Sequence, residues 1–169
     1  MDLSIRTATL DDAEELRHYA IRLFAEDLPG IFRRSVPSLE DEITFVRSRI
    51  EPDNSTLLVA ISDGAIVGLL DVLGGSLEQE AHVGTFGLSV DRGHRGRGVG
   101  TALIEALFAW APEHGVTRLQ AGAWSSNPRA LALYERLGFE REGLCREAVM
   151  VDGAPVDVVM IARLMGSDG

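Results

Sequence analysis

Apolar residues recur along this chain with two periods, one typical of strands and one typical of helices. Seven short apolar or alternating runs predict strands over 3–8, 57–61, 66–73, 83–90, 118–123, 139–150 and 156–164. Four longer stretches, with apolar residues three or four positions apart, predict helices over 9–25, 37–50, 101–112 and 128–137. The pattern therefore predicts about seven strands and four helices.

Turn residues indicate how these elements are joined. Asp63-Gly64 lies between two apolar runs and favours a two-residue hairpin turn. The last two predicted strands are joined by the short segment 151–155. Because hairpins occur in both halves of the chain, the sheet cannot be a regular parallel wind, and we predict a mixed α/β fold. With no repeat or linker, residues 1–169 are expected to form a single domain.

The most informative segment joins the strand at 83–90 to the helix at 101–112. It intersperses glycines with basic residues: Gly93, Gly96, Gly98 and Gly100 among Arg92, His94, Arg95 and Arg97. Glycines at a helix start leave the backbone N–H groups accessible, and these groups together form an anion-binding cradle. The segment therefore predicts a phosphate or pyrophosphate ligand.

Three kinds of glycine-rich loop bind such groups, and residue spacing separates them. A P-loop needs a lysine where Val99 stands, and the chain contains no lysine. A dinucleotide loop needs a third glycine where Thr101 stands. The remaining pattern, Arg/Gln-x-x-Gly-x-Gly/Ala, is matched by Arg95, Gly98 and Gly100.

A second motif follows the loop after an intervening helix and strand. Its spacing, Asn-x-x-Ala-x-x-x-Tyr-x-x-x-Gly-Phe, is matched by Asn127, Ala130, Tyr134, Gly138 and Phe139. Together the two motifs resemble the Gcn5-related N-acetyltransferase (GNAT) family, and the resemblance covers nearly the whole chain. It implies a GNAT-type domain that moves an acetyl group from acetyl-CoA to a primary amine by direct attack.

The resemblance also implies which residues hold acetyl-CoA. The pyrophosphate would be bound by the backbone of Arg95, Gly96, Arg97, Gly98, Val99, Gly100 and Thr101. Leu88, Ser89 and Val90 would pair with the pantetheine arm. A bulge next to Gly87 would free the Leu88 N–H to polarise the thioester carbonyl. Asn127 is expected to cap its helix and to contact the arm.

Candidate catalytic residues follow from the chemistry of acetyl transfer. Tyr134 is the candidate general acid, because an unperturbed phenol pKa near 10 lies close to that of a leaving thiol, about 8.5; a plain core tyrosine is the alternative. Many relatives place a glutamate base at the position of Thr85, and threonine cannot serve. His82 and Glu80 are then the candidate bases, with Asp71 a weaker one; an amine that arrives neutral needs none.

Composition limits the partners. A net charge of −10 argues against nucleic-acid binding and favours cationic amines. No apolar run reaches the roughly 20 residues of a membrane helix, and the acidic N-terminus is unlike a signal peptide. The single cysteine, Cys145, forms no internal disulfide and has no metal-ligand spacing, so a cytoplasmic protein without a metal is expected.

The acceptor is the least determined partner. The family architecture implies an acceptor site between the first two helices and the last hairpin, lined by Leu28, Pro29, Ile31, Phe32 and Trp124. We expect a small amine such as an amino acid or polyamine. A protein N-terminus or lysine is one alternative, and a noncatalytic acyl-CoA sensor, which the threonine at position 85 favours, is another. A homodimer is common among members of the family.

Overall fold

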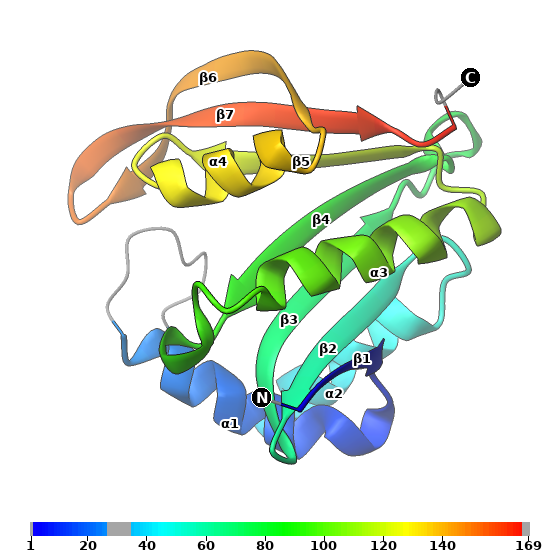
Figure 1. The fold of residues 1–169 in the computed structure, drawn as a ribbon, viewed down its shortest axis with the longest axis vertical. Coiled ribbons are helices and arrows are strands. Elements are labelled where there is room, and N and C mark those ends of the chain that lie inside the picture. Colours follow the sequence, from blue (N-terminus) through cyan, green and yellow to red (C-terminus); the bar gives the residue numbers. More distant parts are fainter. Residues whose placement is uncertain (1, 27–34, 167–169) are drawn as a thin grey trace.

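The computed structural model describes residues 2–26 and 35–166, and within them seven strands and four helices (Figure 1). The strands are β1 (Leu3–Thr7), β2 (Thr56–Ser62), β3 (Ala65–Gly74), β4 (Val83–Val90), β5 (Arg118–Trp124), β6 (Glu140–Val151) and β7 (Ala154–Leu164). The helices are α1 (Ala13–Phe24), α2 (Leu39–Ile50), α3 (Val99–Glu113) and α4 (Pro128–Arg136). The predicted mixed α/β fold is confirmed.

The strands form one sheet in the order β1-β2-β3-β4-β5-β7-β6. Every neighbouring pair is antiparallel except β4 and β5, which run parallel. That parallel ladder contains only three residue pairs, Val83–Arg118, Gly84–Leu119 and Thr85–Gln120. Beyond them the two strands diverge, as Figure 1 shows, so the sheet is open beside the carboxyl half of β4.

Alternation along β2 places consecutive side chains in two separate cores. Leu57 and Val59 pack in a cluster with residues of α1 and α2. Leu58 and Ala60 pack in a cluster with residues of α3 and α4. The helices α1 and α2 therefore cover one face of the sheet, and α3 and α4 cover the other.

Helix α3 packs unusually closely against the sheet. A Cβ on Gly68 would lie 2.9 Å from Cγ1 of Val99, so only glycine allows this approach. The close contact fixes the start of α3 next to β3 and β4. The loop that precedes α3 is thereby held at the open part of the sheet.

Several local boundaries differ from the sequence-based expectation. Helix α3 begins at Val99, two residues early, because Gly98 adopts a left-handed conformation (φ 85°) that caps it. The last hairpin turn is shorter than the predicted 151–155, because Asp152 and Gly153 both have positive φ and turn the chain alone. The predicted hairpin at Asp63-Gly64 is confirmed, with φ of 50° and 81°.

Two features are absent from the described parts of the chain. No helix there is long and apolar enough to cross a membrane. No group of three or more histidine, cysteine, aspartate or glutamate side chains there is arranged to hold a metal ion. Cys145 is exposed on β6.

Candidate active site

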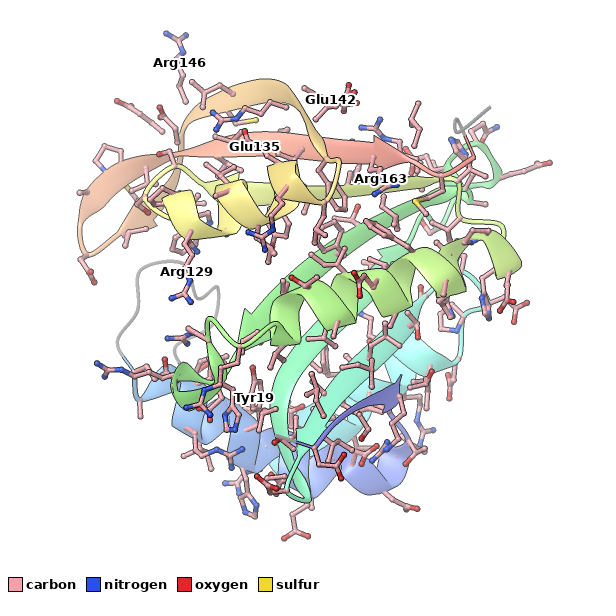
Figure 2. All side chains as sticks on the ribbon, in the orientation of Figure 1. Tyr19, Arg129, Glu135, Glu142, Arg146 and Arg163 are labelled. Carbon is pink, nitrogen blue, oxygen red and sulfur yellow. The ribbon has the colours of Figure 1, made fainter. Side chains whose placement is uncertain are left out.

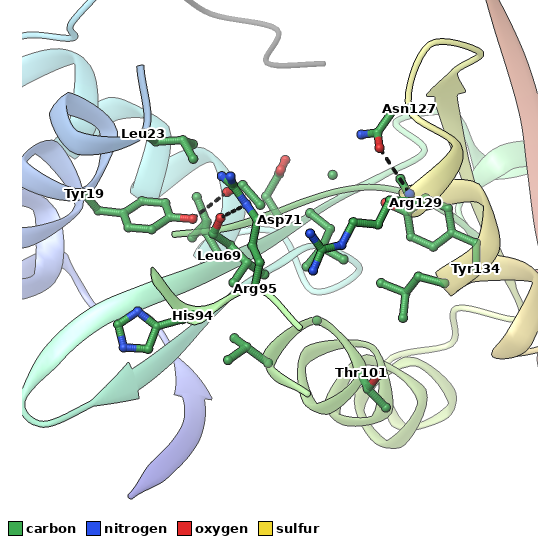
Figure 3. Close-up of a pocket in the computed structure, with 18 of the residues that line it drawn as sticks. Tyr19, Leu23, Leu69, Asp71, His94, Arg95, Thr101, Asn127, Arg129 and Tyr134 are labelled. Atoms are coloured by element: carbon green, nitrogen blue, oxygen red, sulfur yellow. Dashed lines mark hydrogen bonds between the residues drawn. The ribbon is translucent and has the colours of Figure 1, made fainter. Parts of the chain in front are cut away.

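A cleft of about 820 Å³ opens where β4 and β5 separate (Figure 3). Its floor is the carboxyl half of β4, and its two ends differ in character. The loop end is formed by the segment before α3 and by α4, with Gly96, Gly98, Gly100, Thr101 and Arg129 among its residues. The helical end is formed by α1, α2 and β3, with Tyr19, Leu23, Glu42, Phe45 and Asp71 among its residues.

The loop end presents bare backbone. Gly96 and Gly98 have φ of 73° and 85°, which side chains rarely adopt, and a Cβ on Gly98 would have no heavy atom within 4 Å. The next residues, Val99, Gly100 and Thr101, form the first turn of α3 and line the cleft. Their N–H groups have no partner within the helix, and the helix dipole adds positive potential. This end is therefore suited to bind an anion such as pyrophosphate.

The arginine of the loop motif points into the protein rather than offering a free charge. The Arg95 guanidinium donates from Nε to the carbonyl of Val90 (2.9 Å) and forms an ion pair with Glu26 (2.6 Å). The same carboxylate accepts the backbone N–H of Arg92 (3.0 Å). Arg95 therefore holds the shape of the loop. Of the seven predicted loop residues, six line the cleft and Arg97 does not.

A second arginine, Arg129, places a positive charge beside the glycine-rich loop. Arg129 projects from the first turn of α4, and its Nη2 lies 3.3 Å from where a Gly96 Cβ would be (Figure 3). No acidic side chain among residues 2–26 and 35–166 forms an ion pair with it. Arg129 was not among the predicted site residues. The available signal was a basic residue two positions after Asn127, inside the second motif.

The predicted bulge in β4 is wrong. The β3–β4 register runs without interruption from the pair Gly68–Val90 to the pair Gly74–Gly84. No extra residue is therefore inserted near Leu88. A local disruption is not needed here, because the departure of β5 already leaves this part of β4 without a neighbour on that side.

The backbone of Leu88 nevertheless faces the opening. The Asp91 N–H donates to the carbonyl of Val67 on the β3 side (2.8 Å). Backbone groups of alternate residues in an antiparallel pair point the same way, so odd-numbered residues of β4 face β3 and Leu88 faces away. Pairing with β5 stops at Thr85. The N–H and C=O of Leu88 are therefore directed to the cleft, as predicted, although by a different cause.

Tyr134 lies at the wall of the cleft on α4. Its ring packs edge-on against Phe86 (5.5 Å between centroids) and Phe139 (5.8 Å). Burial raises the pKa of the phenol to about 12, so the hydroxyl is protonated at neutral pH. Asn127 lines the same wall, and its Oδ1 accepts the N–H of Ala130 (3.2 Å), which confirms its predicted role as a helix cap.

The helical end is apolar with two embedded carboxyl groups. Its apolar residues are Leu16, Tyr19, Leu23, Phe24, Phe45 and Leu69. Glu42 and Asp71 line the same end, and Glu42 is only 7% exposed. The Tyr19 hydroxyl forms a hydrogen bond with Oγ of Ser89 on β4 (2.9 Å). An apolar wall with acidic groups favours a positively charged ligand with an apolar body.

Glu42 was missed in the sequence, although the pattern contains a signal. It lies three residues after Leu39 and four before Val46, on the stripe that the helical period predicts to be apolar. A glutamate on such a stripe indicates that this face of the helix is not purely apolar packing. The structure places it at a cleft.

The predicted bases Glu80 and His82 do not reach the cleft. Both are exposed and precede β4, at the end where β4 and β5 are still paired. Six residues separate His82 from Leu88, which is about 20 Å along a strand. Thr85 is also exposed, and its Oγ1 accepts a hydrogen bond from Gln120 (3.1 Å). Neither predicted base is kept as a candidate.

The predicted acceptor residues are only partly placed. Leu28, Pro29, Ile31 and Phe32 lie outside the described residues. Trp124 is buried at the end of β5 and does not line the cleft.

A mixed sheet that opens beside a glycine-rich helix start, with a buried tyrosine across the gap, is suited to an enzyme that binds a phosphate-bearing donor. Residues 14–139 match the acetyltransferase (GNAT) family. The chain belongs to this family, and it is an acetyl-CoA-dependent N-acetyltransferase.

Individual relatives act on different kinds of acceptor. The L-amino acid N-acetyltransferase AaaT of Escherichia coli is 32% identical over 108 residues, 63% of this chain and 67% of that protein. The N-alpha-acetyltransferase RimI of Mycobacterium tuberculosis is 32% identical over 154 residues, 90% of this chain and 87% of that protein. The comparisons therefore include relatives that acetylate amino acids and relatives that acetylate protein N-termini.

Solved structures share the fold over the whole chain. A GNAT acetyltransferase from Streptococcus pneumoniae superposes with a TM-score of 0.91 at 25% identity, over 98% of this chain and all of that one. The yncA acetyltransferase from Salmonella typhimurium, solved with acetyl-CoA, has a TM-score of 0.84 at 18% identity over 100% and 97% of the two chains. The second likeness concerns the fold alone.

Proposed function

We propose that the protein acetylates the primary amine of a small molecule, which binds as an ammonium ion at the helical end of the cleft. The observation that carries this proposal is the presence of two carboxyl groups, Glu42 and Asp71, in a largely apolar wall. Asp71 is paired with Arg49 on one of its oxygens. A cation is the ligand that such groups stabilise best. The charge of −10 over the whole chain also attracts cations.

The opposite end of the cleft suits acetyl-CoA. The glycine-rich start of α3 would bind the pyrophosphate through backbone N–H groups. The unpaired edge of β4 would bind an extended pantetheine arm in the manner of an added strand, with Leu88 supplying its N–H and C=O. The glycines at positions 96, 98 and 100 carry no Cβ that would cover these backbone groups.

Two groups of this chain are positioned to assist acetyl transfer. The Leu88 N–H faces the opening and is proposed to polarise the thioester carbonyl. The Tyr134 hydroxyl remains protonated and is proposed to donate to the sulfur as the C–S bond breaks.

The test is release of free CoA thiol from acetyl-CoA with a panel of amines: amino acids, polyamines, aminoglycosides and short peptides with free N-termini. The expected result is turnover with small amines that combine an ammonium group and an apolar body. Turnover with peptides alone would contradict a small-molecule acceptor.

A peptide N-terminus is the second candidate acceptor. The likeness to RimI extends over 90% of this chain, further than the likeness to AaaT. Peptides with free and with acetylated N-termini, compared in the same assay, separate this candidate from lysine acetylation. A lysine acceptor would be turned over in both forms.

Arg129 is expected to contribute to donor affinity. Replacing it with glutamine should raise the KM for acetyl-CoA about three- to tenfold with little change in kcat, because a charge-assisted contact to phosphate is lost at a partly solvated site. Steady-state kinetics at two ionic strengths check this, and the difference should shrink with added salt.

Arg146 provides the matched control for this prediction. It is exposed on β6 and points away from the cleft, whereas Arg129 points into it (Figure 2). Arg146→Gln should therefore leave the KM for acetyl-CoA unchanged. An equal KM for both variants would contradict a role for Arg129.

A further inference from the structure

A carboxyl group is missing from β4 but is supplied by the strand beside it. Thr85, Gly87 and Ser89 are odd-numbered and share one face of β4. Asp71 of β3 pairs directly with Gly87, so its side chain lies on that same face. Gly87, the partner of Asp71, lies two residues after Thr85 along β4 and is therefore closer to the open part of that strand.

The carboxyl group of Asp71 lies over the backbone of Gly87. A Cβ on Gly87 would be 2.8 Å from Oδ1 of Asp71, so the carboxyl group occupies the space that a side chain at position 87 would fill. Both residues line the cleft, as does Leu88, the next residue of β4. The carboxylate is thus held beside the strand residue whose N–H faces the opening.

Arg49 orients this carboxylate. Its Nε donates to Oδ2 of Asp71 (3.1 Å), which leaves Oδ1 on the side of Gly87. The guanidinium is itself held by Oγ of Ser48 (2.9 Å) and by the ring of Phe45 (4.9 Å to the centroid). Arg49 therefore holds Oδ2 of Asp71 in place, and Oδ1 remains on the side of Gly87.

The surroundings make Asp71 a stronger base than an ordinary aspartate. Burial raises the pKa of the Asp71 carboxyl, and the ion pair with Arg49 opposes that rise. The other ionisable groups around it are Glu42 of α2, Tyr19 of α1, and His94 and Arg95 of the segment before α3, which all line the cleft. The facing residues of β2 and β4 are Leu57 and Gly87.

We propose that Asp71 is the general base of the reaction and that Arg49 is its positioning residue; this rests on the proposed acetylation of an amine. The acceptor enters as an ammonium ion and transfers one proton to Asp71, which passes it to solvent. The neutral nitrogen attacks the thioester carbon, so a C–N bond forms and the C–S bond breaks. Tyr134 gives its proton to the departing thiolate, and a second proton from the acceptor nitrogen restores the Tyr134 hydroxyl. The third nitrogen proton stays on the amide product.

The test compares wild type with Asp71→Asn over pH 6–10, using whichever acceptor the amine panel identifies. At neutral pH the variant should lose about 100-fold in kcat/KM, within the range for general-base catalysis. The loss should fall below about fivefold near pH 10, where the amine is already neutral. An acceptor of low amine pKa should show little loss at any pH. A merely structural role would lower the rate equally at all pH values and for all amines.

Arg49→Met gives an independent readout if the first variant binds acetyl-CoA poorly. Removing the cation that stabilises the Asp71 carboxylate should raise its pKa and move the acidic limb of the wild-type profile to higher pH. Asp53→Asn, an exposed aspartate before β2, is the control and should match wild type.

Two results would overturn the proposal. One is an Asp71→Asn variant within about threefold of wild type at neutral pH with an unchanged profile. The other is a pH-dependent loss that appears in Glu42→Gln instead. Turnover of peptides only would contradict the small-molecule acceptor and would leave this test of Asp71 intact.

Discussion

Replacing Tyr134 by phenylalanine should lower kcat by about 10- to 100-fold and leave the affinity for acetyl-CoA within about twofold. The ring would keep its contacts with Phe86 and Phe139, so packing is preserved and only the hydroxyl is lost. Because burial raises the phenol pKa to about 12, the wild-type hydroxyl is a proton donor throughout the physiological range. Its loss leaves the departing thiolate without a nearby acid.

The measurement is steady-state turnover with saturating acetyl-CoA, together with calorimetric titration of acetyl-CoA into both proteins. A thioester whose thiol has a lower pKa needs less protonation, so the loss in Tyr134→Phe should be smaller with such a donor. Equal turnover of the variant and wild type would show that Tyr134 is a packing residue.

Replacing Gly98 by valine should weaken acetyl-CoA binding at least about tenfold. The left-handed backbone at this position costs a β-branched residue roughly 1–3 kcal/mol, and the side chain would occupy the space in front of the first N–H groups of α3. Both effects act on the loop end of the cleft.

Gly93 is the matched control, because its φ is not in the left-handed region and a Cβ there would meet no atom within 4 Å. Gly93→Ala should bind acetyl-CoA as wild type does. Calorimetry measures both affinities, and urea unfolding separates loss of binding from loss of folding. An affinity within twofold of wild type for Gly98→Val would contradict the cradle.

Local patterns were sufficient to predict the elements of the fold. The hairpin at Asp63-Gly64, the cap at Asn127 and the glycine-rich helix start each depend on residues close together in the chain. The start of α3 was misjudged because a glycine can end a loop or cap a helix, and only the backbone angle of Gly98 distinguishes the two.

The ranking of the candidate bases, in which Asp71 came after Glu80 and His82, depends on information that sequence order does not contain. Glu80 and His82 were chosen because they directly precede β4, yet the open part of that strand is its other end. Asp71 reaches this part only because β3 pairs with β4 in one particular register, opposite Gly87. Sequence neighbours along a strand can be far apart, and cross-strand neighbours are known only from the register.

The short parallel ladder also bears on stability. Within residues 2–26 and 35–166, three residue pairs form the β-ladder pairing between the part of the sheet made by β1–β4 and the part made by β5–β7. A donor lying along β4 and contacting α4 would connect these two parts. Its binding energy would then add directly to the free energy of unfolding, by about 2.7 kcal/mol at a hundred times its dissociation constant. The midpoint of thermal unfolding should accordingly rise with the concentration of the donor.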